Sequence, residues 1–483
     1  MRDHSLGYTL DEALTSVGFG TFQGLALVFA GIGWFSEAVE VSLLSFIGPA
    51  LTTEWSLSPT AESLLSTTVF GGMLFGACFW GFISDAYGRR TAIQLVSLGM
   101  FGSGLLSAFS PDYKTLAALR FFMGFGAAGG HVFLSWFLEF LPSSNRGTWM
   151  LVMTCSWIFG EMLEASLAWV IMPRLGWRWL LGFSSIPSLT LFLISNFTPE
   201  SPRYLFTAGK TNDAMRILEK VARINRKELP NGYLIADQNV QVDEEKVPSE
   251  QTTLLTSSTS KIRSLEKSLK SICELFAPDL YVTTLLLWGL NFAYTFAYYG
   301  IQLMVSALSS RQNDCQSTPS IFNTMDTGIY INGFITCSAE LPGLLLAVIL
   351  VDRIGRKPCL EVLTVLSLIF MVPLLWPQGG LVTTSLLICS RMFLSAAFET
   401  LCVYSTEVYP TSVRARGFGI SSAVGRIGGM LCPLVAVGLV RGCHQTLSVI
   451  LFGVVTFLSG IFVMFFPLEM RKRGLADVVA SEQ

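Results

Sequence analysis

The stretch Gly81-Phe-Ile-Ser-Asp85-Ala-Tyr-Gly88-Arg89-Arg90 ends a long apolar run and places one carboxylate and two guanidinium groups in a short turn. A related stretch, Val351-Asp352-Arg353-Ile354-Gly355-Arg356-Lys357, ends another apolar run, with Asp352 following Asp85 by 267 residues. In both turns glycine permits a tight reversal of the backbone. The aspartate and the following arginines can then pair with neighbouring helix ends. We expect a clasp that forms in one conformation and breaks in another; simple charge anchoring at a membrane surface is the alternative.

A second motif repeats at nearly the same offset. Glu139 precedes Arg146-Gly147 by seven residues, and Glu407 precedes Arg414 by seven residues, 268 positions later. Two charged motifs that recur at one spacing predict that the chain consists of two copies of one module.

The composition indicates a membrane protein with many spans. Hydrophobic residues make up 51% of the 483 residues and charged residues only 14%, whereas soluble proteins carry about 25% charged residues. The mean hydropathy is +0.55. No cleavable signal peptide is expected, because the first apolar run is long enough to span a membrane.

Apolar runs of spanning length fall into two sets of six. The first set is 21–50, 63–84, 91–109, 113–140, 148–171 and 177–197, and the second is 280–307, 328–351, 358–376, 379–406, 417–440 and 445–467. The predicted fold class is therefore all-α, with twelve transmembrane helices in two six-helix repeats. The predicted parts are a first bundle at 1–200, a loop at 201–278, a second bundle at 279–470 and a tail at 471–483.

The distribution of Lys and Arg predicts that both termini are cytoplasmic. Connections on the side of the Asp85 and Asp352 turns hold twenty basic residues, and the opposite connections hold five; without the long central loop the balance is eight against five.

The central loop is predicted to begin with an amphipathic helix from Asp213, which would lie on the membrane or on the bundle. From Asp237 to Ser260 the composition is acidic and then Ser/Thr-rich, which is typical of disorder. Glu250 to Leu255 has the form of an acidic dileucine sorting signal. Cys315 and Cys443 are the two cysteines on the outer side, and either a disulfide or two free thiols is consistent with their positions.

These motifs resemble the major facilitator superfamily. Gly-x-x-x-Asp-x-x-Gly-Arg-Arg between spans two and three resembles its signature, and Arg120 with Gly124 and Gly126 resembles its second motif. Three more motifs are similar to those of one branch of this superfamily, the sugar porters and organic ion transporters. They are Glu139 to Gly147, Pro199-Glu-Ser-Pro-Arg203 and Glu407-Val-Tyr-Pro410-Thr-Ser-Val-Arg414.

Three further segments resemble the group related to synaptic vesicle protein 2: Gly31 to Glu40, Phe133 to Phe140 and Leu175 to Leu180. Within it, the chain is similar to plant-type nicotinate transporters, also called organic cation/carnitine transporter-like proteins. The resemblance implies alternating-access transport of nicotinate or its N-methyl betaine, trigonelline. His131 departs from the proline expected after Gly129-Gly130.

Ionisable residues inside membrane spans are costly and tend to be functional. Arg426, deep in span eleven, suits the carboxylate of a substrate, paired through two hydrogen bonds. The resemblance implies that this position carries Arg in anion carriers and Asp in cation carriers. A structural salt bridge from Arg426 to Glu399 or Glu340 is the alternative.

The predicted substrate-binding set joins Arg426 to aromatic and polar residues of other spans. Trp34, Tyr298 and Tyr299 are expected to stack on a pyridine ring near the midplane. The remaining members are Glu40, Glu164, Asn291, Tyr294 and Glu399.

Carboxyl groups held away from water bind protons more readily, so Glu37, Glu40, Glu161 and Glu164 are the proton-coupling candidates, with Glu40 or Glu164 favoured. The gating and motif residues form a larger set. They are Asp85, Gly88, Arg89, Arg90, Arg120, Glu139, Arg146, Asp352, Arg356, Arg391, Glu407 and Arg414.

The prediction is a monomeric secondary transporter of a small organic ion, with protons as co-substrate, in the plasma membrane or a vacuolar or endosomal membrane. Carnitine, choline or a sugar as substrate, transport without proton coupling, and a non-transporting vesicle or sensor protein are the alternatives. No nucleotide-binding loop occurs, and no motif predicts an enzyme, a cofactor, a metal site or a nucleic-acid partner.

Overall fold

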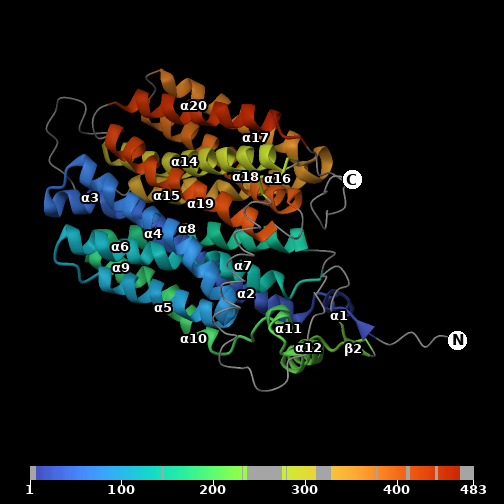
Figure 1. Ribbon diagram of the computed structural model, residues 1–483. Helices are drawn as coiled ribbons and strands as arrows, with labels where there is room; N and C mark the ends of the chain where they lie inside the picture. The colour runs from blue at the N-terminus through green and yellow to red at the C-terminus, as the bar shows by residue number, and fades with distance from the viewer. Residues whose placement is uncertain are drawn as a thin grey trace.

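The computed structural model describes residues 7–142, 146–230, 232–235, 275–278, 280–311, 328–376, 379–409, 414–440 and 444–467. Two helical halves lie side by side, the first drawn in blue to green and the second in yellow to red (Figure 1). The sorting-signal hypothesis at Leu254-Leu255 and the question of Cys315 and Cys443 fall outside the described residues. The predicted four-part division of the chain stays a prediction.

The first half begins with a short strand and ends with helices that lie beyond the bundle. Its elements are β1 (Gly7–Tyr8), α1 (Leu10–Val17), α2 (Thr21–Ser42), α3 (Leu44–Trp55), α4 (Pro59–Tyr87), α5 (Arg89–Ser107), α6 (Tyr113–Ala127), α7 (Gly130–Leu138), α8 (Arg146–Leu175), α9 (Trp177–Ser184), α10 (Ile186–Ser195), α11 (Pro202–Thr207), α12 (Thr211–Asn225) and β2 (Tyr233–Leu234).

All regular elements that the structure describes in the second half are helices. Its elements are α14 (Tyr281–Arg311), α15 (Gly328–Ser338), α16 (Glu340–Ile354), α17 (Arg356–Met371), η2 (Val372–Leu375), α18 (Gly380–Val408), α19 (Arg414–Pro433), the π-helical η3 (Leu434–Leu439) and α20 (Gln445–Met464).

Twelve helical segments match the twelve predicted spans. Ten described helices are long and apolar enough to cross a membrane. The other two segments, α5 and α14, pack against α6 and α19 inside the bundles. Four predicted spans contain an irregular helical turn that the apolar pattern did not reveal, at Leu43, Ala128-Gly129, Ser185 and Ala339, and the backbone there stays in the right-handed helical region.

The two ends of the bundle are named here by their residues. The "α12 end" carries α1, α11, α12 and the turn at Gly88, and the "Trp55 end" carries the close of α3 and the start of α9 (Figure 1). At the Trp55 end, the rings of Trp55 and Trp177 pack edge to face, 5.4 Å apart.

The repeated turn has one backbone geometry in both halves. Gly88 (φ 97°, ψ 158°) ends α4 and begins α5, and Gly355 (φ 100°, ψ 172°) ends α16 and begins α17. Each glycine amide donates to a carbonyl four residues earlier, Ser84 or Val351, at 3.2 Å. Residues with a side chain rarely adopt this conformation, which is why the motif requires glycine.

The amphipathic helix α12 packs on protein. Its apolar face includes Leu218, which packs with Tyr8, Leu10 and Leu14 of the N-terminal segment in a small separate core. The parallel pairing of β1 with β2 holds the same segment, and Asn225 accepts a hydrogen bond from the Phe22 amide at 2.9 Å. The sequence left two positions open for the apolar face of α12, on the membrane or on the bundle. The structure shows this face packed on protein.

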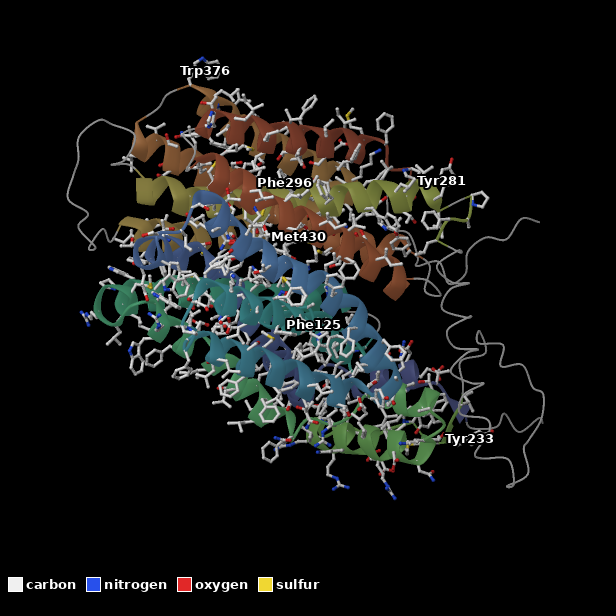
Figure 2. All side chains as sticks on the ribbon, turned by 60° about the vertical axis from the view of Figure 1, so that its left-hand side comes forward. Phe125, Tyr233, Tyr281, Phe296, Trp376 and Met430 are labelled. Atoms are coloured by element: carbon white, nitrogen blue, oxygen red, sulfur yellow. The ribbon has the colours of Figure 1, made fainter. Side chains whose placement is uncertain are left out.

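Close packing of α4 on α6 depends on glycine. A methyl group on Gly124 would overlap the Val69 carbonyl oxygen, and one on Gly72 or Gly76 would overlap carbonyl oxygens of α6. Small residues let transmembrane helices approach this closely. Phe125 of α6 and Phe296 of α14 lie in opposite halves, and Met430 of α19 lies where the halves meet (Figure 2).

We expect Gly124→Ala to lower the free energy of unfolding by about 2 kcal/mol, because the new methyl group meets backbone that cannot move aside. The measurement is the thermal midpoint, Tm, of the purified protein in detergent. Gly102→Ala is the matched control, because its methyl group would have no neighbour within 4 Å. An equal Tm for both variants would contradict this account of the α4–α6 contact.

Candidate functional site

A cavity of about 100 Å³ lies between the two halves. The first half contributes side chains from α2, α7 and α8, and the second contributes side chains from α14, α18 and α19. The lining residues are Trp34, Glu37, His131, Leu134, Met153, Thr154, Trp157, Asn291, Thr295, Tyr298, Tyr299, Ser395, Phe398, Glu399, Cys402, Phe418, Ser422 and Arg426.

The cavity brings together most of the substrate-binding residues predicted from the sequence. Arg426, Trp34, Asn291, Tyr298, Tyr299 and Glu399 all line it, as does the proton-coupling candidate Glu37. Glu40, Glu164 and Tyr294 do not line it. Tyr294 instead bonds the Thr364 hydroxyl at 2.7 Å inside the second half.

Arg426 reaches across the cavity to the first half. Its Nη2 lies 3.3 Å from Glu37 Oε1, and its Nη1 lies 3.7 Å from the sulfur of Met73. Its partner is therefore Glu37, and the predicted alternative of a salt bridge to Glu399 or Glu340 is not what the structure shows. The arginine side chain keeps 11% of its surface accessible, so this guanidinium lies at the cavity wall within reach of a ligand.

Arg391 of α18 lies between two carboxylates, one from each half. Its Nη2 is 2.7 Å from Glu161 Oε2 on α8 and 2.5 Å from Glu340 Oε1 on α16. The Tyr298 hydroxyl donates toward both carboxylates, at 3.2 Å and 3.1 Å. Trp157 donates to Glu161 at 3.1 Å. This network, called here the Arg391 cluster, joins the halves at the wall of the cavity.

Arg120 holds a second cluster, inside the first half. Its Nη1 lies 2.8 Å from Glu40 Oε2, and its Nε donates to Ser107 at 3.2 Å. Glu164 accepts a hydrogen bond from Ser184 at 2.8 Å and lies close enough to feel the charges of Glu40 and Arg120. Each cluster thus places two carboxyl groups around one guanidinium.

His131 joins the halves at a point that sequence reasoning treated only as a departure from a motif. Its Nε2 lies 3.2 Å from the Ser422 hydroxyl, and its ring packs edge to face with Phe418 at 6.0 Å. Trp157 and Phe398 were also missed. The signal available for Trp157 was its position four residues before Glu161, on one helix face.

Between the cavity and the Trp55 end, the two halves are in contact. Thr67 donates to the Met430 carbonyl at 2.9 Å, and Gln302 donates to Ser42 at 3.3 Å. The rings of Phe70 and Tyr299 pack 4.9 Å apart.

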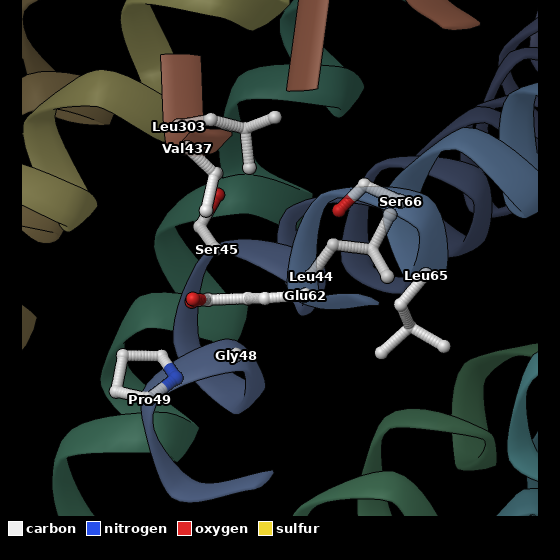
Figure 3. A pocket seen from close by; sticks show the side chains of 9 residues that line it. All are labelled: Leu44, Ser45, Gly48, Pro49, Glu62, Leu65, Ser66, Leu303 and Val437. Carbon is white, nitrogen blue, oxygen red and sulfur yellow. The ribbon is translucent and has the colours of Figure 1, made fainter. Parts of the chain in front are cut away.

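A small space of about 20 Å³ remains beside these contacts, with Glu62 pointing into it and Leu44, Leu303 and Val437 around it (Figure 3). It has room for about one water molecule. The contacts between the halves therefore close the route from the cavity to the Trp55 end.

At the α12 end, the arginines of the Gly88 turn have partners that the sequence motif did not indicate. Arg89 pairs with Glu139 at 3.1 Å and packs on the Tyr204 ring. The Glu200 carboxylate accepts hydrogen bonds from the backbone amides of Arg89 and Arg90 at 2.9 Å and 3.2 Å. It therefore caps the start of α5 from outside the helix.

This arrangement supports the clasp interpretation of the first turn, with Glu139 and Glu200 as its acids. The side chains of Asp85, Arg146, Asp352, Glu407 and Arg414 lie outside the described residues, so their predicted roles stay predictions. Lys357, in the second turn, donates to the Met464 carbonyl at the close of α20, at 2.8 Å. Arg356 also has a partner.

Within the part of the chain that the structure describes, no three His, Cys, Asp or Glu side chains are placed to hold a metal ion. Twelve spans in two repeats, with a largely apolar cavity at their interface that holds a few charged groups, and with contacts that close one end, define the architecture of a membrane transporter.

Comparison with known proteins supports the assignment of this chain to the membrane transporters. The model of the family "Sugar (and other) transporter" matches residues 50–480, and the chain belongs to this family. The likeness to the major facilitator superfamily predicted from the sequence is confirmed.

Two relatives and one solved structure are similar to this chain. It is 46% identical to organic cation/carnitine transporter 7 of Arabidopsis thaliana, over all of this chain and 99% of that protein. It is 31% identical to the synaptic vesicle 2-related protein of Xenopus laevis, over 97% of this chain and 82% of that one. The proton:xylose symporter XylE bound to 6-bromo-6-deoxy-D-glucose has a TM-score of 0.67 over 95% of this chain and 98% of that one. At 18% identity, the XylE likeness shows the fold alone.

The charges of the Arg391 cluster predict how substitutions there change the free energy of unfolding. We expect Arg391→Met alone to cost about 3–5 kcal/mol, because it leaves Glu161 and Glu340 buried without a cation, and the triple variant with Glu161→Gln and Glu340→Gln to cost less. Tm in detergent measures both, with Arg216→Met, a 78% exposed side chain, as control. A triple variant less stable than the single one would refute the charge argument.

Proposed function

We propose that this protein transports nicotinate or trigonelline by alternating access, with protons as the coupling ion. The observation that carries the proposal is the position of Arg426: a guanidinium in the wall of an aromatic-lined cavity between the two halves. Membership of the transporter family and the likeness to an organic cation/carnitine transporter support it.

The cavity fits the chemistry of a flat aromatic acid. Arg426 offers donors to a carboxylate, and the rings of Trp34, Tyr298 and Tyr299 line the same space. A pyridine ring packs well on aromatic faces, and a guanidinium binds a carboxylate through two parallel hydrogen bonds. A substrate carboxylate at Arg426 would replace the contact with Glu37, because both compete for the same donors.

The contacts at the Trp55 end support a transport cycle. The halves are closed there, while the cavity lies on the α12 side of those contacts. The bias of basic residues supports a cytoplasmic position for the α12 end and both termini. In the proposed cycle, a state open at the α12 end faces the cytoplasm, and the opposite state requires the contacts of Thr67, Gln302 and Phe70 to separate.

The two arginine clusters supply sites for the coupling proton. Each has one carboxyl group more than its single guanidinium can neutralise, and an uncompensated charge inside a membrane protein is costly. A proton on one carboxyl group removes the excess. The Arg120 cluster, with Glu40 and Glu164, lies within one half, whereas the Arg391 cluster joins the halves.

The transporter acts as a monomer in the plasma membrane or in a vacuolar or endosomal membrane. The synaptic vesicle 2-related proteins among its relatives support an internal membrane. Each repeat contributes one side of the cavity, so a single chain supplies the whole site.

The test of the substrate site is uptake of radiolabelled nicotinate and trigonelline into proteoliposomes, with and without an inward proton gradient. We expect Arg426→Ala to reduce kcat/KM at least about tenfold, since a charge-assisted hydrogen bond contributes about 1.5–3 kcal/mol. Arg216→Ala is the matched control. Unchanged uptake by Arg426→Ala would assign this arginine to structure.

The same vesicles test coupling. Collapse of the pH gradient with an ionophore is expected to lower accumulation of the substrate. Unaltered accumulation would reject proton coupling and favour uniport. Absence of uptake of either compound would reject the proposed substrates, and carnitine, choline and sugars would be the next candidates.

A further inference from the structure

The carboxylate of Glu399 differs from the other buried acids of the bundle. It lines the cavity from α18, yet within the described residues no hydrogen bond or ion pair involves it. By contrast, Glu37, Glu161 and Glu340 all have an arginine partner. The thiols of Cys155 and Cys402 lie close enough to Glu399 to feel its charge. A carboxylate in such surroundings is costly without a counter-charge.

Aromatic rings line the same cavity as this carboxylate. Phe398, the residue before Glu399 on α18, stacks with Tyr298 at 6.1 Å, and Trp157 on α8 packs edge to face with Trp34 at 5.9 Å. All four rings line the cavity. Aromatic faces together with a negative charge are the usual means of binding a quaternary ammonium group, which offers no hydrogen-bond donor.

The cavity therefore has two unlike poles. Arg426 on α19 can bind a carboxylate, and Glu399 on α18 can bind a cation. We propose that the cavity selects betaines, molecules that carry a quaternary nitrogen and a carboxylate, and that Glu399 is the residue that binds the nitrogen. This inference rests on the proposed function and decides between its two substrates.

The charges of the cavity favour the betaine. Arg426, Glu37 and Glu399 sum to one negative charge when both carboxyl groups are ionised. Nicotinate would add a second negative charge to this space, whereas trigonelline adds none and places its cation beside the unpaired carboxylate. Like charges close together in a medium of low dielectric constant repel strongly. The wild-type protein should consequently prefer trigonelline.

The experiment measures KM for trigonelline and nicotinate in proteoliposomes of wild type, Glu399→Gln and a matched control, Glu219→Gln, whose side chain is exposed on α12. We expect Glu399→Gln to raise KM for trigonelline about tenfold, since the charged contact is lost, and to lower KM for nicotinate. Reversal of the preference supports the inference. A ratio of the two KM values equal to that of wild type overturns it, while the proposed function stands.

A second measurement separates this inference from failure of the proposed function. If wild type carries neither compound, the proposed substrates are wrong, and the role of Glu399 is judged by thermal shift with choline, a quaternary cation without a carboxylate. A rise in Tm that Glu399→Gln abolishes and Glu219→Gln retains supports a cation site at Glu399. The absence of any rise in wild type overturns it.

Discussion

The pairing of buried charges is the constraint on which this structure depends. A charge inside a membrane protein must be neutralised by other parts of the chain, because the bilayer offers no water to do so. Arg120 pairs with Glu40 within the first half. Across the interface of the halves, Arg391 pairs with Glu161 and Arg426 pairs with Glu37. Surfaces that face lipid need only apolar side chains. The interface of the halves, by contrast, depends on a few specific ion pairs.

Irregular helical turns lie next to several of these groups. Ser184 precedes the turn at Ser185, and its hydroxyl donates to Glu164. Glu340 directly follows the turn at Ala339. Gly130 directly follows the turn at Gly129 and lies against Glu37, where a methyl group would overlap the carboxylate. The backbone stays in the right-handed helical region at Ser185, Ala339 and Gly129, so the helices continue through these turns.

Local sequence patterns predicted the spanning helices and the repeated turn. Apolar length predicted the twelve spans, and the glycine of the repeated turn predicted the backbone reversal found at both Gly88 and Gly355. Partners distant in sequence were not predictable. Arg426 meets Glu37, which lies 389 positions away in the chain, and no local pattern distinguishes Glu37 from Glu399 or Glu340 as its partner. Arg89 is likewise held by Glu200, from a segment outside the predicted turn motif.

The two ion pairs across the interface connect binding to motion. Rocking the halves about the cavity strains the pairs Arg391–Glu161 and Arg426–Glu37, because each pair joins one half to the other. Separation of Arg426 from Glu37 leaves both groups without their ion-pair partner, whereas separation of Arg391 from Glu161 leaves Arg391 paired with Glu340 and Glu161 without a cation. A buried charge that loses its partner is destabilising by several kcal/mol, about 3–5. Under the proposed function, a substrate carboxylate at Arg426 and a proton on the released acid would compensate these losses. The groups proposed to bind the substrate would then determine whether the halves can move, which is how a ligand biases a two-state equilibrium.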